Sequence, residues 1–153
     1  MKIRCINNTG EALRHYEYKS LRNDVMGRFG TTQYSEYGAL DVGKEYFVMG
    51  IIVFETYQSY LIDGDGLIMA CPCQLFELID HKVNSDWHFR LIEKQENIYP
   101  FVQAIIGYYE LRFDKKSYEN LTAEKNEDEQ RIYFRWKMEL EKELDGNNIK
   151  ISV

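Results

Sequence analysis

The three cysteines are the first candidates for chemistry, because thiolates bind metals and act as nucleophiles. They are Cys5, Cys71 and Cys73. Structural zinc sites usually space their cysteines by two to four residues and need four ligands. Here one residue separates Cys71 from Cys73, and Cys5 is the only other thiol. We therefore predict buried thiols that pack as small hydrophobic groups, with no metal and no cofactor.

The histidines show no spacing typical of a metal site. His15, His81 and His88 are too far apart for the patterns in which two histidines share one helix face. His81 and His88 lie on either side of an expected turn, so the chain could bring them together. A pair of cysteine and histidine for nucleophilic catalysis stays open, because such residues meet in space and not in sequence.

The acidic residues suggest turns more than catalysis. Asp63 and Asp65 resemble the start of a calcium loop, but Gln74 stands where that loop needs its closing Glu. The run Asp63-Gly64-Asp65-Gly66 is typical of a hairpin turn. Pairs of carboxylates for glycoside hydrolysis could come from many positions, and none is distinguished by its neighbours. The sequence also lacks a Gly-rich phosphate loop and a Gly-x-Ser-x-Gly motif, so we predict no catalytic residues and disfavour an enzyme.

Five residues around the expected hairpin form a candidate surface for binding a partner. Tyr57 and Tyr60 lie close in sequence to Glu55, Asp63 and Asp65. Tyrosine beside carboxylates suits the recognition of a basic, partly apolar protein surface. Ordinary pairing of side chains across neighbouring strands is the alternative explanation.

The charge distribution favours a protein partner over a nucleic acid. The chain of 153 residues has a net charge of −6, and residues 31–113 carry five basic and twelve acidic side chains, a net of −7. Such a chain repels phosphates and attracts basic proteins. The longest apolar run, near residues 47–54, is too short to span a bilayer. No leader segment is recognisable, so we expect a cytoplasmic location and no membrane contact.

The order of the elements predicts one domain over residues 1–153. A first strand is expected within residues 1–10, and residues 11–43 form a long loop, with a short element around residues 16–25. Residues 44–93 predict an antiparallel sheet. It begins with one long strand over residues 45–55, bent at Gly50.

The C-terminal part, residues 117–145, predicts helices. Ile132, Trp136, Leu140 and Leu144 recur every four residues, as on the buried face of an amphipathic helix. A cap at Asn126 with Glu129 predicts its start, Gly146 its end, and residues 149–153 a last edge strand or tail. The fold class is therefore α+β. An antiparallel meander, open or rolled into a small SH3-like barrel, is covered by this C-terminal helix.

Several motifs resemble those of a group of small bacterial proteins without an assigned activity. They include Gly43-Lys44-Glu45-Tyr46-x-Val48-x-Gly50-Ile51, Tyr60-Leu61-Ile62-Asp63, Pro72-x-x-Leu75-Phe76-Glu77-Leu78-Ile79-Asp80, Trp87-x-Phe89 and Gly107-x-x-Glu110-Leu111. The resemblance covers about residues 40–125 and consists of apolar and turn positions. It implies a shared fold and no functional residue.

Three functions are compatible with these patterns. The first is a non-catalytic protein-binding module, in its most concrete form a bacterial immunity protein that neutralises a toxin by covering a basic active site. The second is a small-molecule-binding protein or enzyme with a pocket in the sheet. The third is a regulatory or structural subunit, and a homo-oligomer stays open.

Overall fold

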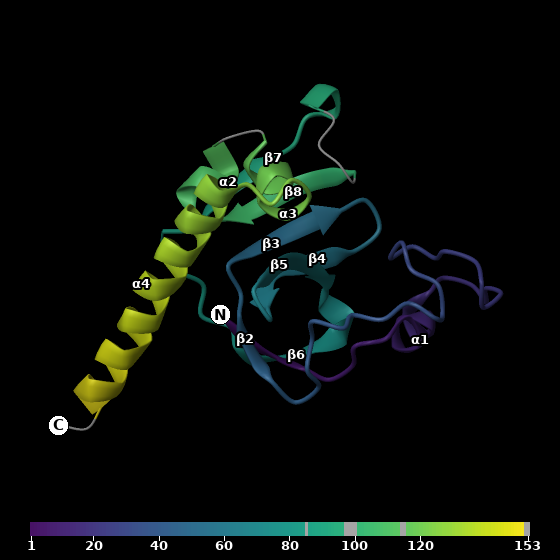
Figure 1. The fold of residues 1–153 in the computed structure, drawn as a ribbon, viewed down its shortest axis with the longest axis horizontal. Helices are drawn as coiled ribbons and strands as arrows, with labels where there is room; N and C mark the ends of the chain where they lie inside the picture. Colours follow the sequence, from purple (N-terminus) through teal and green to yellow (C-terminus); the bar gives the residue numbers. More distant parts are fainter. Residues whose placement is uncertain (85, 97–100, 114–115, 152–153) are drawn as a thin grey trace.

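The structure, a computed structural model, describes residues 1–84, 86–96, 101–113 and 116–151. In these residues the chain forms two antiparallel sheets, with the helices of the C-terminal part beside the larger one (Figure 1). The strands are β1 (Lys2–Cys5), β2 (Glu45–Phe47), β3 (Gly50–Phe54), β4 (Gln58–Gly64), β5 (Leu67–Pro72), β6 (Phe76–Asp80), β7 (His88–Leu91) and β8 (Val102–Gly107).

The two sheets confirm the α+β class but not a barrel. The smaller sheet has the order β2-β1-β6, and the larger has the order β5-β4-β3-β8-β7. All paired neighbours are antiparallel. Neither sheet closes on itself in the described part of the chain, so the SH3-like barrel is not found. The meander is confined to β3, β4 and β5, whose hairpin turns at Asp65 and Gly66 with φ of 50° and 79°.

The strand predicted over residues 45–55 is two strands in two different sheets. β2 pairs with β1 in the smaller sheet, and β3 pairs with β4 and β8 in the larger sheet. Val48 and Met49 connect them, and each is buried in a different apolar core. One core buries Val48 and a side chain of β2, and the other buries Met49 and side chains of β3, so almost every position from 46 to 54 is apolar and the sequence resembles one long strand.

The helices differ from the prediction at both ends of the chain. They are α1 (Gly10–Leu13), α2 (Tyr109–Phe113), α3 (Ser117–Thr122) and α4 (Glu127–Ile151), with 3-10 turns η1 (Arg14–Tyr16), η2 (Cys73–Leu75) and η3 (Lys94–Glu96). No helix is found at residues 16–25. The short helix lies earlier, where Thr9 Oγ1 accepts a hydrogen bond from the Ala12 N–H at 3.2 Å. None of the helices described here is long and apolar enough to cross a membrane.

The start of α4 is as predicted, and its end is not. Asn126 Oδ1 accepts hydrogen bonds from the backbone N–H groups of Asp128 and Glu129 at 3.0 and 3.2 Å, as an N-cap does. Gly146 does not end the helix, which continues to Ile151. Residues 149–153, predicted as a last edge strand or a tail, are therefore helical as far as they are described, and residues 152–153 lie outside the described chain.

Two carboxylates hold α4 against the rest of the protein. Asp63 at the end of β4 accepts a hydrogen bond from the Tyr133 hydroxyl at 2.9 Å, and its other contact is Lys137 Nζ at 2.9 Å. Glu110 on α2 accepts hydrogen bonds from Trp136 Nε1 at 2.7 Å and from the Arg135 guanidinium at 2.8 Å. Polar side chains thus fix the position of a helix that apolar burial alone would leave free to slide.

The buried side chains form two cores. The first, which we call the helix-side core, joins one face of the larger sheet to α2, α3 and α4, with Ile52, Leu61, Ile105 and Tyr133 fully buried. The second, the loop-side core, joins β1, β2, β4 and β5 to the long loop. Phe29 and Leu40 of the loop are buried in it, so the loop is part of the folded structure.

Candidate functional site

The structure separates the five predicted partner-binding residues. Glu55 and Tyr57 lie at the turn between β3 and β4, whereas Asp63 and Asp65 lie at the other end of β4. A strand of that length spans about 20 Å, so the two ends cannot act as one contact point. Tyr60 lies between them.

Asp63, Asp65 and Tyr60 each have a local structural role. Asp63 anchors α4, as described above, and Asp65 is an exposed residue of the hairpin turn. The Tyr60 ring packs at 5.8 Å, edge to face, on Phe76. Burial, together with the neighbouring Cys73, raises the pKa of Tyr60 to about 12.

Tyr57 connects the β3–β4 turn to the long loop. Its ring stacks on Phe54 at 4.8 Å and meets the edge of Phe29 from the loop at 5.1 Å. Glu55 beside it is exposed. The β3–β4 turn, with Glu55 and Tyr57, therefore packs against the long loop, and the two segments together form one surface.

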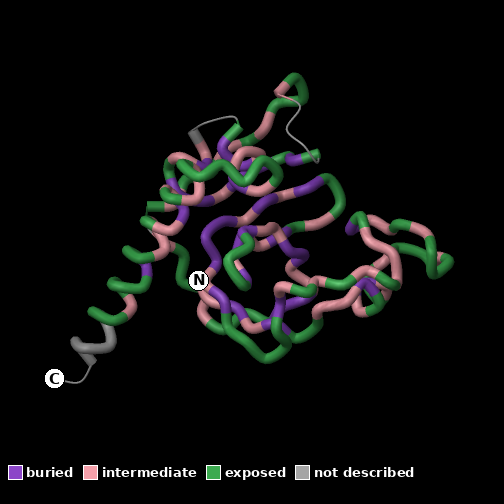
Figure 2. The backbone as a smooth tube through the Cα atoms, in the orientation of Figure 1, coloured by how far each residue is buried: buried purple, intermediate pink, exposed green. Residues whose placement is uncertain are grey.

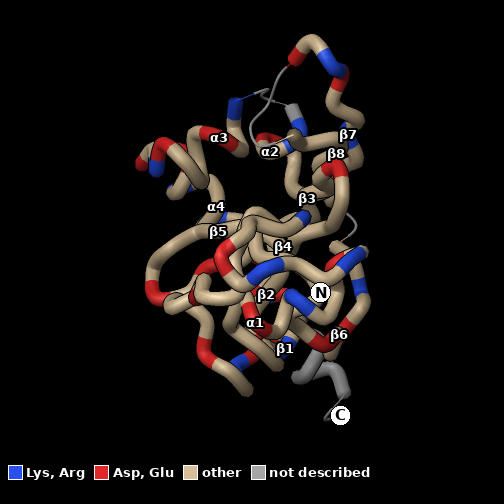
Figure 3. The backbone as a smooth tube through the Cα atoms, turned by 90° about the vertical axis from the view of Figure 1, so that its right-hand side faces the viewer, with Lys and Arg blue, Asp and Glu red and all other residues tan. Residues whose placement is uncertain are grey.

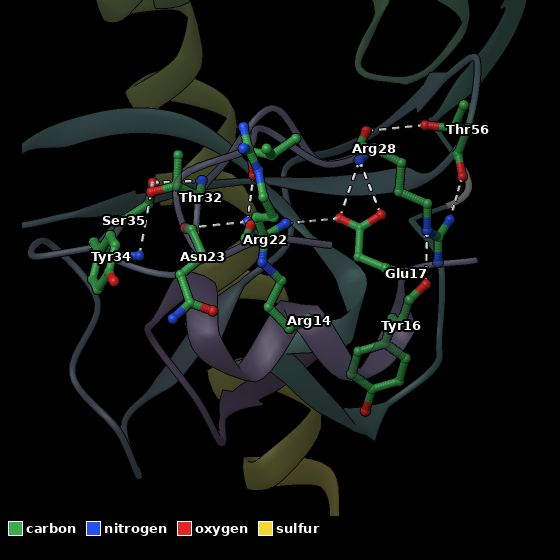
Figure 4. Close-up of polar contacts among 11 residues, drawn as sticks. Arg14, Tyr16, Glu17, Arg22, Asn23, Arg28, Thr32, Tyr34, Ser35 and Thr56 are labelled. Atoms are coloured by element: carbon green, nitrogen blue, oxygen red, sulfur yellow. Dashed lines mark hydrogen bonds and ion pairs between the residues drawn. The ribbon is translucent and has the colours of Figure 1, made fainter. Parts of the chain in front are cut away.

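Arg28 joins the loop to the turn through a reciprocal set of hydrogen bonds (Figure 4). Its guanidinium donates to the backbone carbonyls of Thr56 and, at 2.9 Å, Tyr16. In return the Thr56 hydroxyl donates to the Arg28 carbonyl at 3.0 Å. Bonds in both directions between two residues 28 positions apart hold the loop in a fixed orientation on the turn.

The same guanidinium lies between two aromatic rings. Its central carbon is 4.5 Å from the centre of the Tyr18 ring and 4.4 Å from that of Phe29. Phe29 is buried, whereas Tyr18 is 78 % exposed. Cation–π contact of this kind stiffens an exposed tyrosine without removing it from solvent. We call the exposed groups of Tyr18, Arg28, Glu55 and Thr56 the Tyr18–Arg28 surface.

A buried pair of charges supports this surface from below. Both carboxylate oxygens of Glu17 accept the backbone N–H of Arg28 at 3.1 Å, and the Arg14 guanidinium lies 3.8 Å from one of them. The Glu17 side chain is only 7 % exposed and that of Arg14 only 14 %. Arg14 also donates to the carbonyls of Arg22, Asn23 and Val25, so one side chain organises a segment without regular secondary structure.

Two glycines make this close packing possible. A Cβ on Gly27 would lie 1.7 Å from the Glu17 carboxylate, and one on Gly10 would lie 2.0 Å from the Thr32 carbonyl oxygen. A larger residue at Gly27 would have to displace the Glu17 carboxylate, and one at Gly10 would have to move the backbone at Thr32. The glycines that mark a loop in the sequence therefore also fix its conformation.

Basic side chains contact five acidic residues of the described middle segment, namely Glu45, Asp63, Glu77, Glu96 and Glu110. Arg4 contacts Glu77 at 2.7 Å and Glu45 at 3.2 Å, and Arg90 contacts Glu96 at 2.5 Å. Asp63 and Glu110 are bonded to α4. Acidic and basic segments are mixed over the molecule, as Figure 3 shows. These contacts offset part of the net of −7 over residues 31–113.

The loop itself is basic. Residues 14–28 contain four basic and two acidic side chains. Lys19 and Arg22 are exposed there, and Asp24 lies 3.7 Å from Arg22. The Tyr18–Arg28 surface thus contains one basic member, Arg28, and one acidic member, Glu55, and the exposed Lys19 follows Tyr18 in the sequence.

The thiols are protonated at neutral pH. Burial raises the pKa of Cys71 to about 12 and that of Cys73 to about 11. A thiol in that state is a poor nucleophile and a poor metal ligand. His81 and His88 are exposed, and the His88 ring contacts Tyr109 at 6.0 Å. Among the described residues no three His, Cys, Asp or Glu side chains are grouped closely enough to hold a metal ion.

These pKa values predict a loss of stability at high pH. An unfolded thiol releases its proton around its ordinary pKa of 9.0, whereas the folded Cys71 and Cys73 keep theirs up to about pH 12 and 11. The unfolded state then binds fewer protons, so the free energy of unfolding falls as the pH rises above about 9. Urea unfolding at pH 7.5 and pH 10 measures the difference. A Cys71→Ala/Cys73→Ala variant should show a shallower fall, and an identical slope would contradict the assignment.

Of the residues at and around this surface, the sequence had suggested Glu55 and Tyr57, whereas Tyr18, Arg28 and Glu17 were not among the predicted residues. The signal it had was the unusual length of the loop and its four basic side chains. The contacts of Arg28 go to backbone carbonyls, which any residue at those positions supplies, so no pattern of residue types reveals them.

The comparisons add no relative from which a role could be transferred. No family model, no curated protein and no solved structure matches the chain. The resemblance of residues 40–125 to a group of small bacterial proteins therefore stays a prediction, and function has to be argued from the geometry described above.

Proposed function

We propose that this protein is a non-catalytic binding module that recognises another protein through the Tyr18–Arg28 surface. The observation that carries the proposal concerns Tyr18, a large side chain that is 78 % exposed. Its ring lies on the Arg28 guanidinium, which is itself held by hydrogen bonds to the Tyr16 and Thr56 carbonyls. Tyrosine and arginine contribute most often to the energetic centres of protein interfaces. A surface already rigid before binding loses little conformational entropy when a partner docks.

The charge around this surface favours an acidic partner. Arg28 lies on the Tyr18 ring and Lys19, next to it in the sequence, is exposed, whereas five acidic residues of residues 31–113 are paired with basic side chains. The proposal therefore keeps the protein-binding role expected from the sequence and reverses the charge of the expected partner. Neutralisation of a toxin is one concrete form of it, in which the rigid loop would cover an acidic or aromatic-binding rim of the toxin.

The test compares two tyrosines of the same loop. Tyr18→Ala removes the centre of the proposed surface. Tyr34→Ala removes a tyrosine that is 69 % exposed and lies at the far side of the loop from Thr56 in Figure 4. The immobilised wild-type chain and both variants are incubated with lysate of the source cells, and retained proteins are quantified by mass spectrometry.

We expect an acidic protein that the wild-type chain and Tyr34→Ala retain and Tyr18→Ala loses. With that protein purified, calorimetry should show that Tyr18→Ala weakens binding by about 2 kcal/mol, roughly 30-fold in Kd. Equal retention by all three chains, or enrichment of basic proteins only, would contradict the proposal.

A further inference from the structure

The outer side of α4 is a second surface that the fold does not cover. Its inner side carries Tyr133 and Leu140, which are buried in the helix-side core. The outer side forms an open groove of about 600 Å³. Its described lining comes from α4 alone, namely Glu127, Gln130, Arg131, Phe134, Arg135, Met138, Glu139 and Lys142. Figure 2 shows that much of α4 is exposed along its length.

Apolar side chains occupy the middle of this outer stripe, and charges occupy its ends. Met138 is 57 % exposed, and Phe134 is half-buried against the Tyr133 ring at 5.1 Å. Glu127 and Lys142 at the two ends are exposed. An apolar centre with a charged border is the composition of a helix that packs on another helix.

The stripe is complementary to itself when it is reversed. Turning the helix end to end about Phe134 and Arg135 brings Glu127 to the level of Lys142, Arg131 to that of Met138, and Phe134 to that of Arg135. Gln130 and Glu139 lie nine residues apart, which is half a turn around the helix, so they stand on opposite edges of the stripe and do not meet. The three pairs give an ion pair, an arginine stem on a thioether and a guanidinium on a ring. No two like charges are opposed.

We propose that two copies of this chain associate through the outer stripes of their α4 helices, packed antiparallel about a two-fold axis near Phe134 and Arg135. A parallel arrangement would place Glu127 against Glu127 and Arg131 against Arg131, and like charges oppose such pairing. A two-fold antiparallel contact is closed, so it gives a dimer and not a filament. This surface is separate from the Tyr18–Arg28 surface, and the dimer does not depend on the proposed function.

Sedimentation equilibrium of the full chain over a range of concentrations tests whether the dimer forms. The wild-type chain should show a monomer–dimer equilibrium, and Met138→Lys should remain a monomer at every concentration, because it places a second positive charge opposite Arg131 of the other copy. Met26→Lys is the matched control, since Met26 is 67 % exposed in the loop; it should dimerise as the wild type does. A wild-type chain that is monomeric throughout, or a Met138→Lys variant that dimerises normally, would overturn the proposal.

A charge exchange tests the antiparallel orientation. Glu127→Lys and Lys142→Glu should each weaken self-association about tenfold, because each creates two like-charge contacts in the dimer. An equimolar mixture of the two variants should form a heterodimer more tightly than either variant associates with itself. Unchanged far-UV circular dichroism of both variants shows that the helix is intact. Variants that associate with themselves as tightly as with each other would contradict the antiparallel contact.

Discussion

Replacement of Tyr133 by Ala is expected to lower the free energy of unfolding by about 3–5 kcal/mol, the range for truncating a large buried aromatic side chain. Tyr133 is fully buried, and its ring meets Tyr108 at 6.5 Å and Phe134 at 5.1 Å, edge to face. Its hydroxyl donates to Asp63 at 2.9 Å. The variant therefore leaves a cavity under α4 and removes one of the four side chains with which the helix is bonded to Asp63 and Glu110. Urea unfolding followed by circular dichroism measures the loss.

Two further variants separate the parts of this effect. Tyr133→Phe keeps the ring and removes only the hydrogen bond to Asp63, so it should lose about 1 kcal/mol. Tyr34→Ala makes the same truncation at an exposed site and should change stability by less than about 0.5 kcal/mol. If Tyr133→Ala were no more destabilising than Tyr34→Ala, the docking of α4 on β4 would be refuted.

The helical periodicity predicted α4 and, in part, the residues that it buries. The four-residue spacing of Ile132, Trp136, Leu140 and Leu144 indicates a helix with one apolar face. In the structure Tyr133 and Leu140 are the buried pair, and Ile132 and Trp136 are half-buried beside them. The face is rotated because hydrogen bonds with Asp63 and Glu110 fix the helix about its axis. Those partners come from β4 and α2, and periodicity within a helix contains no information about them.

The sheet arrangement was predicted only in part, because local sequence patterns do not record which distant strands pair. Local patterns gave the α+β class and the hairpin of β4 and β5, which depends on a turn at Asp65 and Gly66. They missed β8 and the second sheet, in which β1 pairs with β6 and Arg4 faces Glu77 across 73 positions of the chain. Contacts at that separation are chosen by the packing of whole sheets, and a sequence pattern records only the alternation within each strand.

The loop over residues 11–43 has a defined conformation that its sequence did not predict. Polar composition and glycines indicate a long loop over residues 11–43. The structure shows that Arg14, Glu17 and Arg28 connect it internally and to Thr56, so its conformation is defined by charged side chains and not by regular secondary structure. A rigid segment of that kind can hold Tyr18 in a fixed position for a partner.

Replacement of Glu17 by Ala is expected to destabilise this loop by about 3 kcal/mol, because it leaves one member of a buried ion pair without its counter-charge. The Arg14 guanidinium would lose the carboxylate at 3.8 Å while remaining enclosed, and the Arg28 N–H would lose both acceptors at 3.1 Å. With Arg28 released, the bonds to Thr56 and the contact with Tyr18 loosen together. Amide hydrogen exchange over residues 25–35 should accelerate more than a hundredfold, since about 2.7 kcal/mol corresponds to that factor.

Glu36→Ala is the matched control, since Glu36 lies in the same loop with an exposed side chain. Its exchange rates and its unfolding midpoint should equal those of the wild type. Glu17→Gln keeps the shape of the side chain and one acceptor but removes the charge. Its acceleration of exchange should therefore lie between those of Glu36→Ala and Glu17→Ala. Because the support and the surface are connected through Arg28, Glu17→Ala should also weaken capture of the acidic partner. Unchanged exchange rates over residues 25–35 in Glu17→Ala would show that the buried pair does not hold the loop. Tyr18 would then not be held rigid for a partner by Glu17 and Arg28.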